Sequence, residues 1–288
     1  MEIPNIYFPN LGLSFQLNSE AFNLFGLSVY WYGIILTSGI ILGTLLACYI
    51  AKKEKIDPDI MTDFVLYDIL FALLGARTYF VIFNWEYYKA NPMQILNIRQ
   101  GGIAIYGAVI ASIIVAIIYT RKKKVRFLHF ADIATYGLIL GQAIGRYGNF
   151  FNKEAFGGYT NNLFAMAILK SEAKLPISEE VLNHVTTFSQ FGAAEYIQVH
   201  PTFFYESTWN ALLLILLLCY RKHRKAYGEI FCLYLIGYGV GRFWIEGLRT
   251  DQLLLWVIQV PVSQIVAIIS IIMGIIGIVV CRKKYLIK

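Results

Sequence analysis

The sequence GQAIGRYGNFFNKEAFG, residues 141–157, begins as the outer half of an apolar helix and ends in a polar run. Arg146 stands at the boundary between the two. A guanidinium beside hydrocarbon is costly, so arginines there usually face a bundle interior or a water-filled cavity and serve a function. The same Gly-x-x-x-Gly-Arg-aromatic pattern recurs at residues 237–243 with Arg242, and a looser copy ends in Arg77. These three arginines call for a common explanation.

The composition is that of a membrane protein. Of the 288 residues, 58% are hydrophobic and 15% charged, and the mean hydropathy is +0.58. Apolar runs of about 18 or more residues recur, as in a polytopic helical membrane protein, whereas the alternating segments of a β-barrel are absent. The four cysteines lie in apolar segments without ligand spacing, so we predict no metal site, disulfide framework or cofactor.

Basic clusters orient the predicted spans. We expect seven, at residues 30–50, 62–83, 103–119, 130–149, 205–220, 229–246 and 262–280. Lys- and Arg-rich clusters follow the first, third, fifth and seventh, at residues 52–55, 121–126, 221–225 and 282–284. The positive-inside rule makes that side cytoplasmic, with the N-terminus outside and the C-terminus inside. This placement explains the net charge of +7 without a nucleic-acid partner.

The predicted fold is therefore all-α, a single membrane domain over residues 1–288. Residues 1–29 carry no Lys or Arg and are expected to form an extracytoplasmic arm at the membrane interface. Residues 150–204 connect the fourth and fifth helices on the outside. Because long structureless loops are uncommon, we expect this connection to be a small folded cap.

The spacing of the arginines predicts one outward-facing anion site. Gly-x-x-x-Gly faces let membrane helices approach closely, which would bring Arg146 and Arg242 near each other. Tyr238, Arg242, Glu246 and Arg249 share one helix face, where Glu246 can hold one arginine and leave others free. The arginine fork suits phosphate, so the site is expected to grip a lipid phosphate. The alternative is that each arginine extends to the outer headgroups.

Two further groups are candidates for this site. Tyr106 opens the third span, where it is equally plausible as an interfacial belt residue. His200 precedes the fifth span and has a suitable ordinary pKa, near 6.5, for a general base; as a helix-entry residue it would be equally ordinary. The cysteines lie at the cytoplasmic ends or inner halves of their helices. Any thiol chemistry at an outer site must therefore use a thiol of the substrate.

The motifs resemble those of the prolipoprotein diacylglyceryl transferase family. The segment GRYGNFFNKE, residues 145–154, is similar to the family signature. Further matches occur in the family's order, at Tyr32-Gly33, Gly75-Ala-Arg77, Gly101-Gly102, His200-Pro201-Thr202 with Tyr205-Glu206, and Tyr238 to Arg249. The resemblance covers residues 30–280. The first thirty residues and the 158–199 segment match only in kind.

The resemblance implies a multi-pass enzyme of the bacterial plasma membrane, with its active site toward the outer leaflet. Such enzymes transfer the diacylglyceryl group of phosphatidylglycerol to the lipobox cysteine of a prolipoprotein signal peptide and release glycerol 1-phosphate. Arg146 and Arg242 match positions that stabilise the leaving phosphate or bind its headgroup. The other predicted substrate-binding positions are Tyr32, Asn149, Glu154, Gly157, Tyr238 and Glu246, together with Arg77 and Arg249.

The sequence departs from the family at Tyr106, where many members carry a histidine assigned as the base that deprotonates the thiol. Tyr106 could be tuned by nearby arginines, His200 or Glu154 could take the proton, or electrostatics could suffice. The alternative function is a membrane transporter or binding protein for an anionic lipid or small anion. Transporter sites usually lie near the membrane midplane, whereas these arginines lie in the outer halves of their helices.

Overall fold

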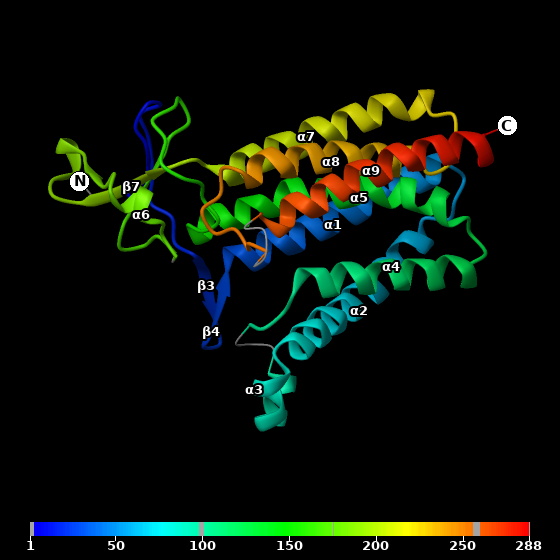
Figure 1. The fold of residues 1–288 in the computed structure, drawn as a ribbon, viewed down its shortest axis with the longest axis horizontal. Helices are drawn as coiled ribbons and strands as arrows, with labels where there is room; N and C mark the ends of the chain where they lie inside the picture. The colour runs from blue at the N-terminus through cyan, green and yellow to red at the C-terminus, as the bar shows by residue number, and fades with distance from the viewer. Residues whose placement is uncertain (1–2, 98–100, 175, 256–259, 288) are drawn as a thin grey trace. The chain divides into compact units, whose positions relative to one another are not determined.

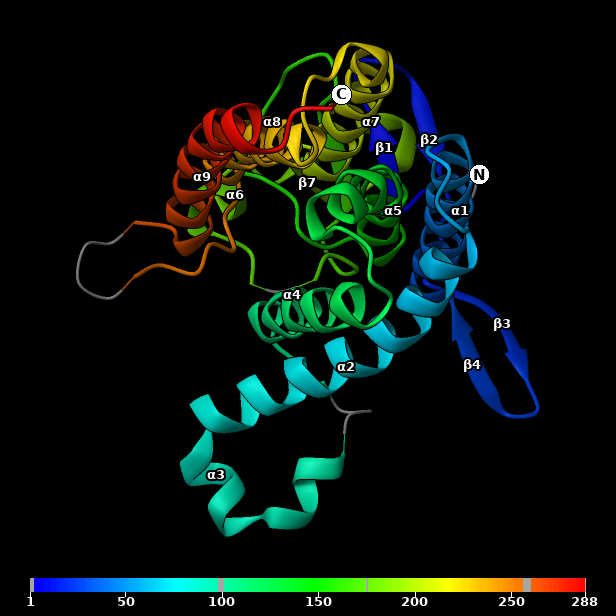
Figure 2. The ribbon, with the colours of Figure 1, turned by 90° about the vertical axis from the view of Figure 1, so that its right-hand side faces the viewer.

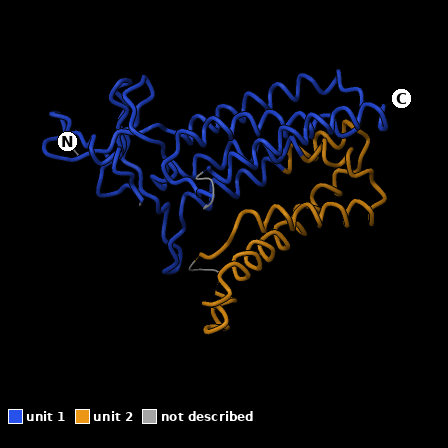
Figure 3. The backbone as a smooth tube through the Cα atoms, viewed as in Figure 1, with its two compact units in different colours: residues 1–43, 135–288 blue, residues 44–134 orange. Residues whose placement is uncertain are grey.

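The computed structural model describes residues 3–97, 101–174, 176–255 and 260–287. The chain divides into two compact units (Figure 3). The first comprises residues 1–43 and 135–288, and the second comprises residues 44–134. The chain enters the second unit inside helix α1 (Trp31–Lys53) and returns to the first inside helix α5 (Phe127–Asn152).

Within the described residues, six helices are long and apolar enough to cross a membrane. They are α1, α2 (Asp59–Phe83), α4 (Ile105–Lys122), α5, α7 (Thr202–Tyr220) with η3 (Arg221–His223), and α9 (Val262–Lys284). Helix α8 (Glu229–Glu246) has the bounds of the sixth predicted span, but three of its 18 residues are charged and it is not among these six helices. The polytopic helical prediction is thus confirmed in its coarse form.

Helix α8 packs between α7 and α9 (Figures 1 and 2). On one side, Trp209 Nε1 donates to the carbonyl of Gly237 at 2.8 Å. On the other, a Cβ at Gly274 would lie 2.7 Å from the Cys232 carbonyl oxygen. These neighbours keep the charged groups of α8 inside the helix bundle of the first unit.

Helices α1 and α5 approach closely through glycines. A Cβ at Gly43 would lie 2.5 Å from the Gly137 carbonyl oxygen, and one at Gly39 would lie 3.2 Å from that of Gly141. The predicted close contact is therefore confirmed for Gly141. It is wrong for Gly145, whose nearest neighbour is a Leu36 methyl at 3.9 Å.

The predicted cap is a folded β-structure, so the prediction of an all-α chain is wrong. Its antiparallel sheet has the order β2-β1-β5-β7-β6. Short segments α6 (Glu179–Leu182) and η2 (Ser189–Phe191) precede and follow β6. The strands are β1 (Ile6–Phe8), β2 (Leu13–Phe15), β5 (Met166–Leu169), β6 (Thr186–Thr187) and β7 (Glu195–Val199).

Part of the predicted N-terminal arm belongs to this sheet. Ile6 pairs with Ile168, which in turn pairs with Ile197. All three side chains are fully buried in an apolar cluster that includes Phe156 and Phe203. The arm therefore completes the core of the cap, because the apolar face of β5 and β7 needs a neighbouring strand.

A hairpin of β3 (Glu20–Leu24) and β4 (Leu27–Tyr30) leads directly into α1. Its tip, Phe25-Gly26, has positive φ at both residues, as hairpin turns of the I′ type require. The Phe25 side chain is 98% exposed.

The second unit is built on a pair of antiparallel helices, α2 and α4, whose connection holds two further short helices. Helices α2 and α4 meet where a Cβ at Gly75 would lie 2.7 Å from the Gly107 carbonyl oxygen. At the other end, the Tyr119 hydroxyl donates to the Ile60 carbonyl at 3.0 Å. Helix α3 (Trp85–Ala90) and the 3-10 helix η1 (Pro92–Leu96) follow α2.

Each unit brings two of the predicted basic clusters together. In the first unit, Ala226 forms a β-bridge with Leu286, beside clusters 221–225 and 282–284. In the second, Glu54 pairs with His129 at 3.3 Å, beside clusters 52–55 and 121–126. This pairing is what the positive-inside interpretation requires of each unit.

Candidate active site

A buried glutamate on α7 gathers three arginines. Glu206 is 3% exposed. Its Oε2 lies 2.5 Å from Arg146 Nη2, and its Oε1 lies 3.1 Å from Arg242 Nη1 and 3.7 Å from Arg249 Nη1. A carboxylate in the interior needs such partners to offset the loss of water. The predicted convergence of Arg146 and Arg242 is confirmed, and Arg249 joins them.

The predicted polar face of α8 is also present. Arg242 forms an ion pair with Glu246 one turn further along the helix. Its Nη2 also lies 3.5 Å from Ser263 Oγ on α9. One turn before Arg242, the ring of Tyr238 stacks on that of Tyr234, with centroids 5.5 Å apart. The prediction that Glu246 holds one arginine is therefore confirmed for Arg242.

Arg249 follows the end of α8 and carries its own carboxylate. Its Nε and Nη2 donate to Asp251 Oδ1 and Oδ2 at 2.9 and 2.7 Å. Burial disfavours the charged guanidinium, but the hydrogen bonds and charge of Asp251, with the charges of Glu206 and Glu246, raise its pKa above the ordinary value. Arg249 is thus a fixed cation at one edge of the cluster.

Arg146 has fewer polar partners than its two neighbours. Its side chain is 24% exposed, and its ion pair with Glu206 uses Nη2. Within the residues that the structure describes, Nε and Nη1 have no hydrogen-bond partner. These groups are available to an anion that enters the site.

The segment after α5 carries the second polar cluster. Glu154 Oε1 accepts from Asn149 Nδ2 at 3.2 Å and from Asn152 Nδ2 at 3.1 Å. Its Oε2 pairs with Lys174 Nζ at 2.7 Å. Lys153 and Ala155 have positive φ on either side of Glu154, so the chain turns sharply here and points this carboxylate back toward the two amides.

Gly157 joins the start of α7 to the end of α8. Its N–H donates to the His200 carbonyl at 3.0 Å, and the N–H of Gly158 donates to the Leu248 carbonyl at 2.9 Å. A Cβ at Gly157 would lie 2.7 Å from the Leu248 carbonyl oxygen and 2.8 Å from His200 Cβ. Only glycine fits, and through this junction it sets the positions of the helix that carries Glu206 and of the segment that carries Arg249.

His200 lies at the same junction. Its Nδ1 is 3.3 Å from the Tyr205 hydroxyl. Burial lowers the pKa of His200 below its ordinary value, opposed in part by the charge of Glu180. The imidazole is therefore neutral near pH 7 and able to accept a proton.

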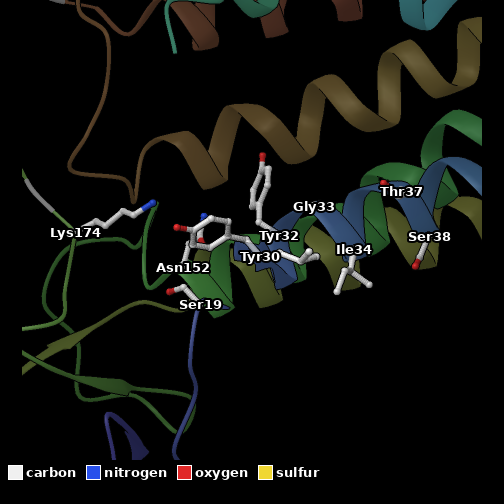
Figure 4. A pocket seen from close by; sticks show the side chains of 10 residues that line it. Ser19, Tyr30, Tyr32, Gly33, Ile34, Thr37, Ser38, Asn152 and Lys174 are labelled. Atoms are coloured by element: carbon white, nitrogen blue, oxygen red, sulfur yellow. The ribbon is translucent and has the colours of Figure 1, made fainter. Parts of the chain in front are cut away.

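Two cavities flank the Glu154–Lys174 pair. The smaller, about 310 Å³, is lined by charged and amide groups that include Asn149, Glu154, Arg249 and Asp251. The larger, about 800 Å³, runs along the start of α1 and includes Tyr32 and Asn152 (Figure 4). Lys174 lines both cavities. The predicted residues Asn149, Glu154 and Arg249 thus share one hollow, and Tyr32 lines its neighbour.

Arg77 and Tyr106 belong to the second unit. The five N–H groups of Arg77 donate to main-chain carbonyls of Gln94, Ile95, Asn97, Gly101 and Gly102 at 2.5–3.1 Å. The ring of Tyr88 lies 5.0 Å from the Arg77 guanidinium carbon. No donor remains for a phosphate, so the geometry supports a structural role and not the predicted lipid contact. Tyr106 is the second residue of α4, and its role stays a prediction.

Three residues of the site were not among the predicted site residues. A carboxylate within an apolar span needs a partner, and this signal could have singled out Glu206. Asp251, two residues after Arg249, is a short-range partner that spacing alone could have suggested. Lys174 had no such signal, because it reaches Glu154 only through the folding of the cap.

Comparisons with known proteins agree on one family. The family model described as prolipoprotein diacylglyceryl transferase matches residues 19–280. A phosphatidylglycerol–prolipoprotein diacylglyceryl transferase of Clostridium novyi is 44% identical over 269 residues, 93% of this chain and 97% of the relative. Proteins of the same name from Bacillus cereus and Bacillus anthracis are 43% and 42% identical over 273 residues, 95% of each chain.

Proposed function

The chain belongs to the prolipoprotein diacylglyceryl transferase family, and from this membership we propose its reaction and the residues that perform it. It transfers the diacylglyceryl group of phosphatidylglycerol to the lipobox cysteine thiol of prolipoproteins and releases glycerol 1-phosphate. The observation that carries the residue assignment is the group of arginines on Glu206, in which Arg146 has unused donors.

The reaction makes a carbon–sulfur bond and breaks a carbon–oxygen bond. The substrate thiolate attacks the glyceryl carbon, and the phosphate oxygen leaves with the bonding electrons. Negative charge grows on that phosphate, so cations fixed beside it stabilise the transition state more than the ground state. We assign this role to Arg146 and Arg242, which Glu206 and Glu246 hold in place.

The nucleophile comes from the acceptor protein. Among the described residues, no disulfide joins the cysteines of this chain, Cys48, Cys219, Cys232 and Cys281, and two of them are buried. None of the contacts that build the arginine cluster involves a cysteine. A substrate thiol with an ordinary pKa near 8.5 would ionise more readily beside these arginines.

Glu154, His200 and Tyr106 are the candidates for the proton acceptor. Glu154 lines the smaller cavity, and its two oxygens are held by amides and by Lys174. His200 is kept neutral by burial. The pH dependence of kcat/KM in Glu154→Gln, His200→Gln and Tyr106→Phe separates them, because loss of the base abolishes the acidic limb of the profile.

We propose a seven-span topology within one membrane domain, with α8 as the added span. Its charged groups have partners inside the bundle, as intramembrane charges require. The N-terminus lies outside, the basic clusters lie in the cytoplasm, and the site faces the outer leaflet. The sheet of the cap then lies outside the membrane, above the arginines.

The first experiment is a transfer assay with purified protein in phosphatidylglycerol micelles and a lipobox peptide with one cysteine. We expect the peptide to gain one diacylglyceryl unit as glycerol phosphate is released, and Cys→Ser in the peptide to abolish both. Folded protein that bound the lipid but released nothing would favour the alternative, a transporter or binding protein for an anionic lipid.

A further inference from the structure

The cap contributes one cation to the smaller cavity. Lys174 Nζ lies 2.7 Å from Glu154 Oε2, and the Lys174 side chain is 54% exposed. Its backbone N–H donates to the Lys153 carbonyl at 3.2 Å, which fixes the base of the side chain beside the end of α5. The ammonium group is therefore tethered at the cavity while its long stem remains free to turn.

The charges that line this cavity balance one another. Arg249 faces Asp251, and Lys174 faces Glu154. An anion that enters must therefore take a cation from one of these pairs. Arg249 is 12% exposed and held by two hydrogen bonds to Asp251, whereas Lys174 is largely exposed and makes a single ion pair. An entering anion therefore separates Lys174 from Glu154 at a lower cost in free energy than Arg249 from Asp251.

Glu154 remains partly satisfied when Lys174 moves. Its Oε1 keeps the amide donors of Asn149 and Asn152. Its Oε2 becomes free to accept a hydrogen bond from a hydroxyl group. The same movement thus places a hydrogen-bond donor for a phosphate beside a hydrogen-bond acceptor for a hydroxyl group. Phosphate and hydroxyl are the two kinds of group that a glycerol phosphate presents.

The volume of the cavity fits this ligand. At about 310 Å³ it lies at the lower end of the range for small-molecule sites, roughly 300–1,000 Å³. It suits a small polar group better than acyl chains or a peptide segment.

On these grounds we propose that the smaller cavity receives the glycerol phosphate headgroup of the lipid donor, and that Lys174 of the cap is a further headgroup-binding residue. This inference rests on the proposed transferase function. Before the lipid binds, Glu154 holds Lys174 at the cavity. When the lipid binds, Lys174 transfers its hydrogen bond to the phosphate and Glu154 accepts from a glycerol hydroxyl.

The test compares Lys174→Gln with a matched control, Lys170→Gln. Lys170 also belongs to the cap and pairs with Glu195 at 2.7 Å, but it lines neither cavity. Because a neutral glutamine cannot replace the charge-assisted hydrogen bond to the phosphate, Lys174→Gln should raise the KM for phosphatidylglycerol at least about tenfold. Free glycerol 1-phosphate should inhibit this variant more weakly by a similar factor. Lys170→Gln should change neither value, and Lys174→Arg should restore most of the affinity.

The outcomes distinguish a failure of the Lys174 proposal from a failure of the proposed transferase function. Equal KM and inhibition constants for Lys174→Gln, Lys170→Gln and the unchanged protein would overturn the role of Lys174 while leaving the transferase function intact. A lowered Tm for Lys174→Gln with unchanged KM would overturn it too, because the Glu154 pair would then be only structural. Absence of glycerol phosphate release from the unchanged protein would instead contradict the proposed function itself.

Discussion

Two buried glutamates in the first unit have opposite partner sets. Glu229 is fully buried and receives the Tyr220 hydroxyl at 2.8 Å and Arg282 Nε at 2.9 Å on one oxygen. Its other oxygen accepts from the backbone N–H groups of Lys225 and Ala226 at 2.7 and 3.2 Å. Glu206 is 3% exposed, and the recorded partners of its carboxylate are three arginine side chains.

The difference shows what distinguishes a binding site from an ion pair that only holds helices together. At Glu229 one carboxylate meets one arginine, a hydroxyl and two backbone donors, and the result joins the end of α9 to the start of α8. At Glu206 one carboxylate meets three arginines, two of which have a second carboxylate partner in Glu246 or Asp251, and Arg146 keeps donors that no described group uses. A buried ion pair by itself therefore indicates little about function, whereas donors without a described partner on a partly exposed cation are available to a ligand.

Replacing each glutamate in turn should give the largest difference between the two groups. Glu206→Gln and Glu229→Gln should each lower the stability of the protein, because Arg146 loses its ion-pair partner in the first variant and Arg282 loses its own in the second. Glu206→Gln should also lower the transfer rate per folded molecule at least about 100-fold, since the arginines lose their positions. Glu229→Gln should leave that rate within about twofold, because its groups lie outside the site. Thermal unfolding and the transfer assay on monodisperse protein measure both effects. Equal loss of rate in the two variants would contradict the distinction.

Arginine-to-lysine substitutions test the same contrast with the charge retained. Arg146→Lys should lower kcat about 100-fold, because an ammonium cannot replace the planar fork at the phosphate. Arg282→Lys should keep near-normal kcat and lower the Tm, because an ammonium cannot reproduce the hydrogen bonds of the guanidinium fork to Glu229 and Tyr220. Steady-state transfer rates and Tm values check the pair. Full activity in Arg146→Lys would remove the bidentate role from Arg146.

Arg77 should behave like Arg282, which has a structural role, and not like Arg146. Its guanidinium is saturated by main-chain carbonyls, so Arg77→Gln should destabilise the protein by about 2–4 kcal/mol through lost hydrogen bonds. The KM for phosphatidylglycerol should stay unchanged in the molecules that fold. A raised KM at full stability would restore the predicted lipid contact of Arg77.

Acid should destabilise the protein through His200, which precedes the helix that carries Glu206. Burial lowers the folded-state pKa of His200, so the unfolded chain binds a proton more readily. The stability that neutral His200 contributes is full above the ordinary pKa of about 6.5 and is lost as the pH falls through the lower folded-state pKa. Tm should therefore decline between about pH 7 and 5, and His200→Gln should decline less over the same range. Parallel declines in both proteins would exclude this contribution.

The smallest effect is expected for the cysteines. A variant with Cys48, Cys219, Cys232 and Cys281 all changed to Ala should keep the transfer rate within about twofold, because the thiol that reacts belongs to the substrate. Two of these side chains are buried, so Tm should fall modestly. A folded variant without turnover would contradict the assignment of the reacting thiol to the substrate.

The helices and the repeated arginine motif could be predicted from local patterns. Apolar length located the helices to within a few residues, and the Gly-x-x-x-Gly-Arg repeat marked Arg146 and Arg242, which meet at Glu206. The same pattern misled at Arg77, whose donors bind the connection that follows α3. A motif shows that an arginine is held in apolar surroundings, but it does not show which acceptors will hold it.

The sequence by itself determined the membrane class, the helix bounds, the basic ends of the helices and the family, because each depends on residues close together in the chain or on composition. Only the tertiary structure decided that strand β1 completes the sheet of the cap, that Glu206 joins three arginines and that Lys174 reaches Glu154. The physical reason is that these contacts join distant parts of the chain. The strand pairing answers the need to bury an apolar face, and the charged contacts answer the need to neutralise buried groups.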